Sequence, residues 1–420
     1  MIKNVRDEIP QFNITSILYS NFFFFLPFEI SYNLPPDIFY FSLLKHEYFI
    51  TQINPKEAPV IIWLQGGPGD TSLFGLFLEN GPFGVAAKGR LKPRKYSWSA
   101  NHNVIYIDNP VGSGWSFTEH AEGNARNESA VAGNLKEAVR QFFALFPEIR
   151  GNELYVCGES YAGKYVPALS RAIADGNSRG DRPKIGLAGV AIGNGWIDPV
   201  HQLDYGDYLY QLGLLDLNGR VEIQALEREA KDLMCRDEYA LAGLALARMA
   251  TKFKQLTGLE AYFDYLEGTK VVDDGPSFAS WIQGEGARRA IHVGNSTFHT
   301  DKAKVAGYLA ADVAQSAAPA VADLLERGYR VLLYSGQLDI VCAYPMLEGF
   351  LRNLNWTGAA VYEKAPRRQW WVAQNQLAGY SKSAANLTEV LVRNAGHAAP
   401  IDQGFWVWEM ITRFTRHQSF

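Results

Sequence analysis

The stretch Leu154-Tyr-Val-Cys-Gly-Glu-Ser-Tyr-Ala-Gly163 decides the fold of this 420-residue chain. In it an apolar strand pattern runs into Gly158-x-Ser160-x-Ala162, and a helical pattern follows at once. This order predicts a nucleophile elbow, in which small residues two positions before and after the serine let the backbone pass closely. The alternative is a helix N-cap serine in a glycine turn, and the partners described below favour the elbow.

Six continuous apolar runs predict strands that are buried on both faces. Helical patterns at 128–145, 161–174 and 317–327 lie between several of these runs. Strands that alternate with helices predict a doubly wound, mostly parallel sheet, and the elbow assigns this α/β sheet to the α/β-hydrolase fold. The runs occupy residues 60–64, 103–108, 153–157, 189–192, 331–334 and 388–392.

The alternation of strands and helices fails between residues 200 and 315. Because its part at 217–252 is rich in Ala, Leu, Glu and Arg, we expect a mainly helical cap insertion over the carboxyl ends of the strands. The α/β-hydrolase core then comprises residues 58–199 and 316–420. Residues 1–57 show little regular pattern and are expected to be an irregular N-terminal segment, with an aberrant gene model as the alternative.

Asp339 and His397 are the expected partners of Ser160. A serine hydroxyl needs a base to take its proton, and that base needs an acid to set its tautomer. In α/β-hydrolases the acid follows a late strand and the histidine stands in a loop near the end of the chain. Asp339 follows the strand pattern at 331–334, and His397 follows the last predicted strand. A surface-loop position is the alternative for Asp339.

A glycine-rich loop is expected to complete this site. The attacked carbonyl develops a negative oxygen, which two preorganised backbone N–H groups stabilise. One N–H group belongs to Tyr161, and the other is expected from the loop Gln65-Gly66-Gly67-Pro68-Gly69, which follows a predicted strand. Because no lysine follows these glycines, the loop does not match a phosphate-binding loop.

Two carboxylates stand near these motifs. Glu159 directly precedes Ser160, and Glu79 lies in the sequence Leu78-Glu-Asn-Gly-Pro82. If both converge on the pocket, repulsion between like charges raises one pKa, and the pair shares a proton. A protonated pair donates a hydrogen bond to a substrate carboxylate, best at acidic pH. The alternative, two solvated surface acids, has equal weight at this point.

Charge and hydropathy give no support to several classes of partner. The formal net charge of -4 gives no reason to expect nucleic acid or an anionic membrane as partner. No apolar run is long enough to cross a bilayer.

Of the three cysteines, Cys157 is expected to be an inert buried thiol, whereas a disulfide between Cys235 and Cys342 is left open.

Five N-x-S/T sequons together favour the secretory pathway, where such asparagines are glycosylated. The N-terminus carries no clear signal peptide, because residues 1–10 are charged and polar and the apolar run at 22–28 is short and interrupted by Pro27. The sequons stand at Asn13, Asn127, Asn295, Asn355 and Asn386.

Five long motifs, in the order typical of the family, resemble the serine carboxypeptidases, and most of all their vitellogenic carboxypeptidase-like branch. The resemblance covers residues 58–414 and is specific, because each motif is long. The motifs are Trp63-Leu-Gln-Gly-Gly-Pro-Gly69, Asp108-Asn-Pro-Val-Gly-Ser-Gly-Trp-Ser-Phe117, Gly158-Glu-Ser-Tyr-Ala-Gly-Lys-Tyr-Val-Pro167, Gly336-Gln-Leu-Asp339 and Gly396-His397.

The resemblance implies an exopeptidase that removes single residues from the C-termini of peptides or proteins at acidic pH, without metal or cofactor. By position it implies Ser160 as nucleophile, His397 as base and Asp339 as orienting acid. Gly67 and Tyr161 would supply the oxyanion N–H groups. A lysosomal or extracellular location follows from the family, and a homodimer is left open. The residues implied to bind the terminal carboxylate of the substrate are Trp63, Gln65, Gly66, Glu79 and Glu159.

Two positions depart from the usual family pattern. Gln65 stands where many members have Asn, and Asp70 replaces a small residue or a cysteine, which removes a common disulfide. Two rival functions remain open. An acyltransferase uses the same triad to pass the acyl group to an alcohol, and a binding or protective protein on this scaffold has lost turnover. The latter would show a broken triad, which this sequence does not have.

Overall fold

The computed structural model describes four strand segments at 23–25, 28–30, 42–44 and 46–49. Beyond these it describes residues 54–86, 89–259, 263–267 and 278–420. The sequon at Asn13 lies outside the described residues. Within the described ranges no helix combines the length and the apolar character needed to span a bilayer.

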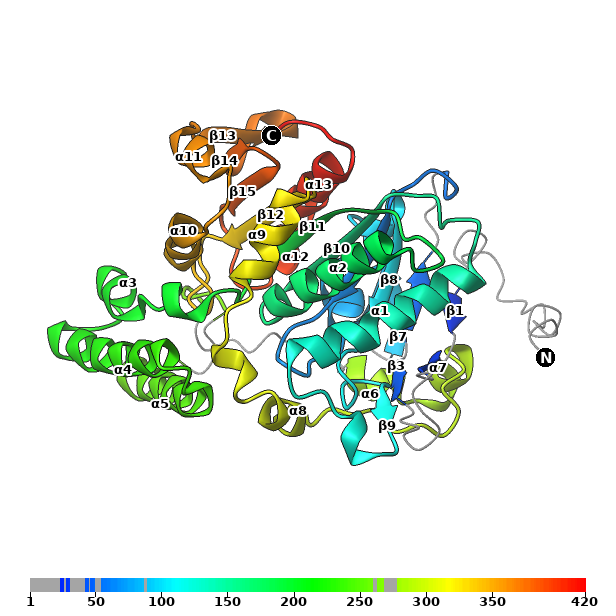
Figure 1. Cartoon of the computed structure of the whole chain (residues 1–420), viewed down its shortest axis with the longest axis horizontal. Coiled ribbons are helices and arrows are strands. Elements are labelled where there is room, and N and C mark those ends of the chain that lie inside the picture. Colours follow the sequence, from blue (N-terminus) through cyan, green and yellow to red (C-terminus); the bar gives the residue numbers. More distant parts are fainter. Residues whose placement is uncertain are drawn as a thin grey trace.

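One ten-stranded sheet forms the centre of the described chain (Figure 1). Its six middle strands run parallel to one another, and two further strands at each edge are paired antiparallel. The predicted mostly parallel sheet of the α/β-hydrolase fold is therefore confirmed. In spatial order the strands are β1 (Phe23–Phe25), β4 (His46–Phe49), β8 (Asn103–Ile107), β5 (Val60–Leu64), β10 (Leu154–Glu159), β11 (Leu187–Gly193), β12 (Arg330–Gly336), β15 (Leu387–Val392), β14 (Gln376–Ala384) and β13 (Arg368–Val372).

Helices cover both faces of this sheet, which explains why its middle strands are apolar throughout. In β5, Val60 and Ile62 pack into one hydrophobic cluster, whereas Ile61 and Trp63 pack into another. The helices of the first cluster are α1 (Glu128–Leu145), α2 (Ala162–Arg179), α9 (Ala318–Glu326), α10 (Tyr344–Asn353) and α11 (Ala359–Lys364). The second cluster contains α12 (Ala399–Asp402) and α13 (Gly404–Thr415).

The region expected to form a cap holds helices of two groups. The first group has its own hydrophobic cluster and projects from one side of the molecule (green in Figure 1). It consists of α3 (Tyr205–Gln211), α4 (Leu217–Cys235) and α5 (Tyr239–Thr257). The helix α4 lies within the predicted helical stretch 217–252, and α5 begins in it and continues past its end. The second group consists of α6 (Phe278–Ile282) and α7 (Glu285–Ala290), which pack on the second cluster of the core, and α8 (Lys302–Tyr308), which packs on the first.

Residues 1–57 were expected to be irregular, yet they contain four short strands. β4 pairs with β8 and β1 pairs with β4, both antiparallel. Strands of three or four residues are too short for a hydrophobic period to stand out, so the pattern did not predict them. Two small sheets complete the described strands: β2 (Phe28–Ile30), β3 (Ser42–Leu44) and β9 (Phe117–Thr118), and the hairpin β6 (Phe83–Ala86) with β7 (Arg90–Pro93).

Short helical turns connect these elements. A π-helical turn, η1 (Gly75–Glu79), follows the glycine-rich loop. The 3-10 turns are η3 (Trp98–Ala100), η4 (Ala121–Gly123), η5 (Pro199–His201), η6 (Asp312–Ala314) and η7 (Ala373–Asn375).

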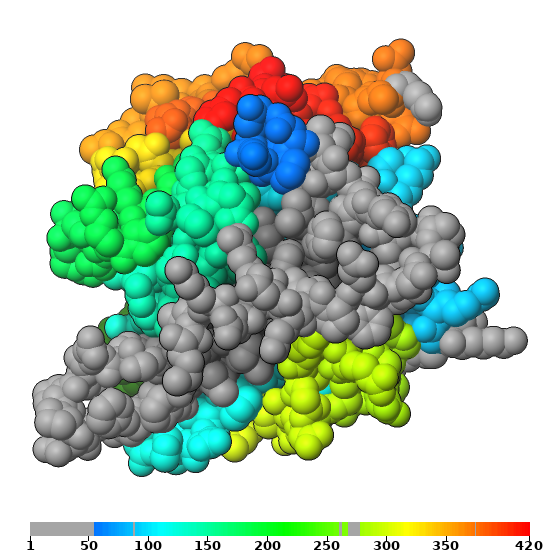
Figure 2. Space-filling view, turned by 90° about the vertical axis from the view of Figure 1, so that its right-hand side faces the viewer, coloured from blue at the N-terminus to red at the C-terminus, as the bar shows by residue number. Residues whose placement is uncertain are grey.

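The amino ends of the central strands meet the C-terminal residues at one end of the molecule. In Figure 2, the residues that follow Asn54 (blue) lie beside the C-terminal segment (red). Asn152 Nδ2 donates to the carbonyl oxygen of Pro55 at 3.1 Å, and His417 Nε2 lies 3.1 Å from Glu153 Oε2. The opposite, carboxyl ends of the strands carry the residues described next.

Candidate active site

Ser160 lies on a tight turn between β10 and α2. Its φ is +61°, a conformation that residues with a side chain rarely adopt. Its N–H donates to the Gly193 carbonyl at 3.0 Å, and its carbonyl oxygen accepts from the N–H groups of Gly163 and Trp196, each at 2.9 Å. These three bonds hold the strained residue, and its side chain remains half-buried.

The glycine-rich loop packs directly against this turn. A Cβ atom added at Gly66 would lie 2.6 Å from the Tyr161 nitrogen and 2.6 Å from the Glu159 carbonyl oxygen. Only glycine therefore lets the loop come so near to the N–H group of Tyr161. Gly67 has a φ of +112° and lines the same cavity as Ser160 and Tyr161. The structure thus brings together the two segments expected to form an oxyanion hole.

Asp108, a member of one of the family motifs, holds the glycine-rich loop in position. Its Oδ1 accepts from the Thr71 hydroxyl at 2.5 Å and from the Ser72 N–H at 2.9 Å, and its Oδ2 accepts from the Trp115 N–H at 2.7 Å. The Ser72 hydroxyl in turn accepts from the Gln65 N–H at 3.1 Å. Burial raises the pKa of Asp108 to about 6.

Asp70, the departure noted in this loop, is half-exposed. Its Oδ1 lies 3.0 Å from Lys302 Nζ at the start of α8. An ion pair therefore links the loop to α8, and Asp70 leaves the backbone of the loop in place, since its own N–H donates to the Gly66 carbonyl at 3.1 Å.

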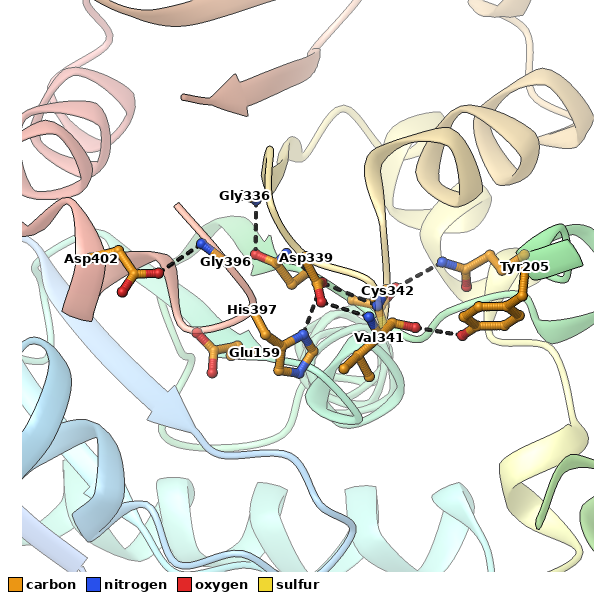
Figure 3. A network of polar contacts seen from close by, with 12 residues as sticks. Glu159, Tyr205, Gly336, Asp339, Val341, Cys342, Gly396, His397 and Asp402 are labelled. Atoms are coloured by element: carbon orange, nitrogen blue, oxygen red, sulfur yellow. Dashed lines mark hydrogen bonds and ion pairs between the residues drawn. The ribbon is translucent and has the colours of Figure 1, made fainter. Parts of the chain in front are cut away.

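His397 and Asp339 are in direct contact (Figure 3). His397 Nδ1 lies 2.9 Å from Asp339 Oδ2, and the two side chains are 3% and 0% exposed. Asp339 Oδ1 accepts from the Val341 N–H at 2.7 Å, and Oδ2 also accepts from the Cys342 N–H at 3.1 Å. These two donors fix the position of the carboxyl group, which orients the imidazole.

Asn194 was not among the predicted site residues. Its Nδ2 donates to Asp339 Oδ2 at 2.7 Å, and its Oδ1 accepts from the Gly336 N–H at 3.2 Å. Its neighbour Gly193, the last residue of β11, accepts from the Ser160 N–H, so the carboxyl end of β11 supports both the serine and the acid. The signal in the sequence was a Gly-Asn-Gly turn at the carboxyl end of a predicted strand. Among the described residues no hydrogen bond joins the Ser160 hydroxyl to His397.

Glu79 and Glu159 converge on Gln65, which decides between the two alternatives left open above. Gln65 Nε2 donates to Glu79 Oε1 at 3.0 Å and to Glu159 Oε1 at 3.2 Å. Gln65 Oε1 accepts from the Trp63 indole N–H at 2.9 Å. Both carboxyl groups are buried, so they are not solvated surface acids.

Burial changes the protonation of this pair. It raises the pKa of Glu79 to about 7, and burial together with the charge of Glu79 raises the pKa of Glu159 well above its usual range. Oε2 of each carboxyl group has no hydrogen-bond donor. A proton on the pair makes it a hydrogen-bond donor, and the carboxylate of a ligand is a suitable acceptor for that hydrogen bond.

The three cysteines are all free. Cys157 and Cys342 are buried and Cys235 is exposed, so the disulfide left open between Cys235 and Cys342 is not formed. Burial raises the pKa of the Cys157 thiol above its usual range, as expected for an inert thiol.

A parallel sheet with a strained serine at its carboxyl edge, a histidine–aspartate pair and a glycine loop against the serine defines an α/β-hydrolase. The chain belongs to the serine carboxypeptidase family, whose model matches residues 36–417. This match begins within the N-terminal segment, before the start at residue 58 that the motifs suggested. The prediction of a serine-type carboxypeptidase, a hydrolase, is thereby confirmed.

Relatives of known name support this assignment. The chain is 51% identical to the venom serine carboxypeptidase of Apis mellifera, covering 89% of this chain and 81% of that protein. It is 44% identical to the vitellogenic carboxypeptidase of Aedes aegypti, with 89% and 80% covered. The fold matches that of Kex1(Δ)p, a prohormone-processing carboxypeptidase from Saccharomyces cerevisiae, with a TM-score of 0.83, 22% identity and 94% and 91% covered.

Proposed function

We propose that Ser160 is the nucleophile of this carboxypeptidase, that His397 takes and returns its proton, and that Asp339 orients the imidazole. The contact between His397 Nδ1 and Asp339 Oδ2 carries this proposal, since it leaves Nε2 as the nitrogen for proton transfer. The Ser160 oxygen attacks the last peptide carbonyl, and His397 passes the proton to the departing amine. Water then cleaves the acyl-enzyme by the same steps in reverse.

The main-chain N–H groups of Gly67 and Tyr161 stabilise the oxyanion in this mechanism. Support comes from the close approach of the glycine loop to Tyr161, which a side chain at Gly66 would prevent. Both N–H groups belong to segments held by several hydrogen bonds, so they need no rearrangement when the charge develops.

The terminal carboxylate of a peptide or protein binds to the Glu79–Glu159 pair in this proposal. Gln65 and Trp63 orient the pair, and Gly66, which has no side chain, lets the loop pack against the Glu159 backbone. A carboxylate is accepted only while a proton is present on the pair, because three negative charges would otherwise meet in a buried site. The pKa of Glu79, raised to about 7, places this binding mode at acidic to neutral pH.

The proposed location is the secretory pathway, either lysosomal or extracellular. Four sequon asparagines have exposed side chains, as glycosylation requires: Asn127, Asn295, Asn355 and Asn386. The Apis mellifera relative is named for venom, which is a secreted fluid. Treatment of protein from insect cells with a glycosidase that removes N-glycans tests this, since an unchanged mass argues against passage through the secretory pathway.

Digestion of a mixed peptide pool at pH 5, read by mass spectrometry, tests the proposed function. We expect stepwise loss of single C-terminal residues, and no loss with the Ser160→Ala variant. Peptides with an amidated C-terminus are the matched control, since they lack the carboxylate that Glu79 and Glu159 bind. Transfer of an acyl group to an alcohol without any trimming of peptides would instead support the acyltransferase.

A further inference from the structure

Arg94 is a half-buried cation that the proposed mechanism does not use. It directly follows β7, and its guanidinium group reaches back to η1, the turn that carries Glu79. Its two terminal nitrogens donate to four main-chain carbonyl groups, all of them in buried residues. Two of these residues precede Glu79 and two follow it, so the guanidinium group holds the main chain on both sides of this residue. The four are Leu76 at 3.2 Å, Phe77 at 2.7 Å, Gly81 at 2.7 Å and Phe83 at 3.2 Å.

The turn η1 needs a donor that its own main chain does not provide. In a π-helical turn, a carbonyl group accepts from the N–H group five residues later. For Phe77 that residue is Pro82, which has no N–H group. For Leu76 it is Gly81, whose N–H group donates instead to the Gly75 carbonyl at 3.4 Å. Because buried carbonyl groups without a donor are costly, the guanidinium group stabilises this conformation of the turn.

Glu79 depends on this main chain for the position of its carboxyl group. Its Oε1 accepts from Gln65, and its Oε2 has no donor in the part of the chain that the structure describes. The next residue, Asn80, is held through its carbonyl oxygen, which accepts from the Trp98 N–H at 2.8 Å. The carboxyl group therefore lies where the turn places it, and residues 94–98 hold the turn.

We infer that Arg94 is a positioning residue for the carboxylate site: it fixes the main chain around Glu79, so that this carboxyl group meets a peptide whose last peptide carbonyl lies at Ser160. The inference rests on the proposed function, because that proposal assigns Glu79 to the terminal carboxylate. The planar fork of donors is the property that matters. A lysine would keep the charge, but its three donors share one nitrogen and do not span four carbonyl groups.

The test compares two substrates in the wild-type chain and in Arg94→Met. One is N-blocked phenylalanyl-leucine, which has a free carboxylate, and the other is N-blocked phenylalanine methyl ester, which needs the triad alone. For the dipeptide at pH 5 we expect KM to rise at least tenfold while kcat stays within threefold, because a displaced Glu79 binds the carboxylate less tightly. For the ester we expect kcat/KM to stay within twofold. An unchanged KM for the dipeptide, or an equal loss with both substrates, overturns the inference.

Two further variants separate position from charge and from stability. Arg94→Lys keeps the charge, so KM for the dipeptide should remain at least fivefold above wild type, and a wild-type KM would contradict the positioning role. This milder variant also provides the test where Arg94→Met does not fold. Arg330→Met is the matched control, since half-buried Arg330 also donates to a main-chain carbonyl, that of Phe414, but begins β12 at the end of the sheet away from Ser160. Its KM should equal that of the wild type, and a rise equal to that in Arg94→Met overturns the inference.

Glu79→Ala distinguishes failure of the inference from failure of the proposed carboxylate site. Alone it should raise KM for the dipeptide at least tenfold. In its background Arg94→Met should add less than threefold, because no carboxyl group is left to position. A further tenfold rise in the double variant overturns the inference and leaves the carboxylate site standing. A wild-type KM in Glu79→Ala itself removes Glu79 from the proposed site, and the inference with it.

Discussion

Lys164 Nζ lies 2.7 Å from Asp312 Oδ2, and both side chains are almost fully buried. Lys164 belongs to α2, four residues after Ser160, and Asp312 begins η6, at the end of the region expected to form the cap. The same Oδ2 accepts from the Tyr161 hydroxyl at 2.8 Å, and Oδ1 accepts from the Glu128 N–H at 3.1 Å. A buried ion pair thus joins this region to the helix that carries the elbow.

Lys164→Met should destabilise the protein by about 3–5 kcal/mol, because it leaves Asp312 buried without its counter-charge. The measurement is the free energy of unfolding from urea denaturation. Lys302→Met is the control: its ion pair with Asp70 is exposed, so its loss should cost at most about 1 kcal/mol. Equal stabilities of the two variants would show that the buried pair adds nothing to the attachment of this region.

Ser160→Ala should reduce kcat by a factor of about 10⁶ while the circular dichroism spectrum stays unchanged. A fluorophosphonate probe should label the wild-type chain and leave the variant unlabelled. Ser170→Ala is the control on the same helix, since its buried hydroxyl has no hydrogen-bond partner and its removal should change little. Labelling of the Ser160→Ala variant would mean that another residue is the nucleophile.

Gly66→Ala should lower kcat by a factor of about 10²–10³, the usual effect of losing one oxyanion donor. The physical reason is steric, because the new Cβ would force the loop away from Tyr161. Gly286→Ala tests whether any added methyl group has this effect, since Gly286 lies in α7 with no atom within 4 Å of an added Cβ. An active Gly66→Ala variant would argue that the loop contributes no oxyanion contact.

Glu79→Gln should make KM less dependent on pH. The folded-state pKa of Glu79 is raised to about 7, so in the wild type the Glu79 carboxyl group keeps its proton below pH 7 and becomes a negative charge beside the substrate carboxylate above it. KM for peptides should therefore rise as the pH increases from 6 to 8. In the variant the amide stays neutral and keeps a donor, so KM should change much less over this interval. Steady-state kinetics at fixed ionic strength measure both profiles.

Stability provides a second readout of the same group. Because its pKa is raised above the usual value of 4.5, folded Glu79 keeps its proton between pH 4.5 and 7, where the unfolded chain has lost it. Wild-type stability from this group is thus greatest below pH 4.5 and decreases as the pH rises to 7. The decrease should be smaller in Glu79→Gln. Profiles of KM and stability identical to wild type would remove Glu79 from the proposed carboxylate site.

The middle of the sheet could be predicted, but its edges could not. β5 and β10 are buried on both faces, which produces the continuous apolar runs that marked them. β13 exposes Arg368, Gln369 and Trp371, and this mixed pattern resembles that of a loop. Edge strands therefore leave a weaker signal in the sequence.

The sequence by itself determined the parts of the site that depend on local geometry. The turn at Ser160 needs small residues beside it, and the loop needs glycine where it packs against the backbone of that turn. Both requirements therefore appear in the sequence as short motifs. Only the tertiary structure decided which distant side chains meet. It joined Glu79 and Glu159 through Gln65, brought Asn194 to Asp339, and paired Lys164 with Asp312. The physical reason is that the energy of a buried charge depends on its partners in space, which residue order does not specify.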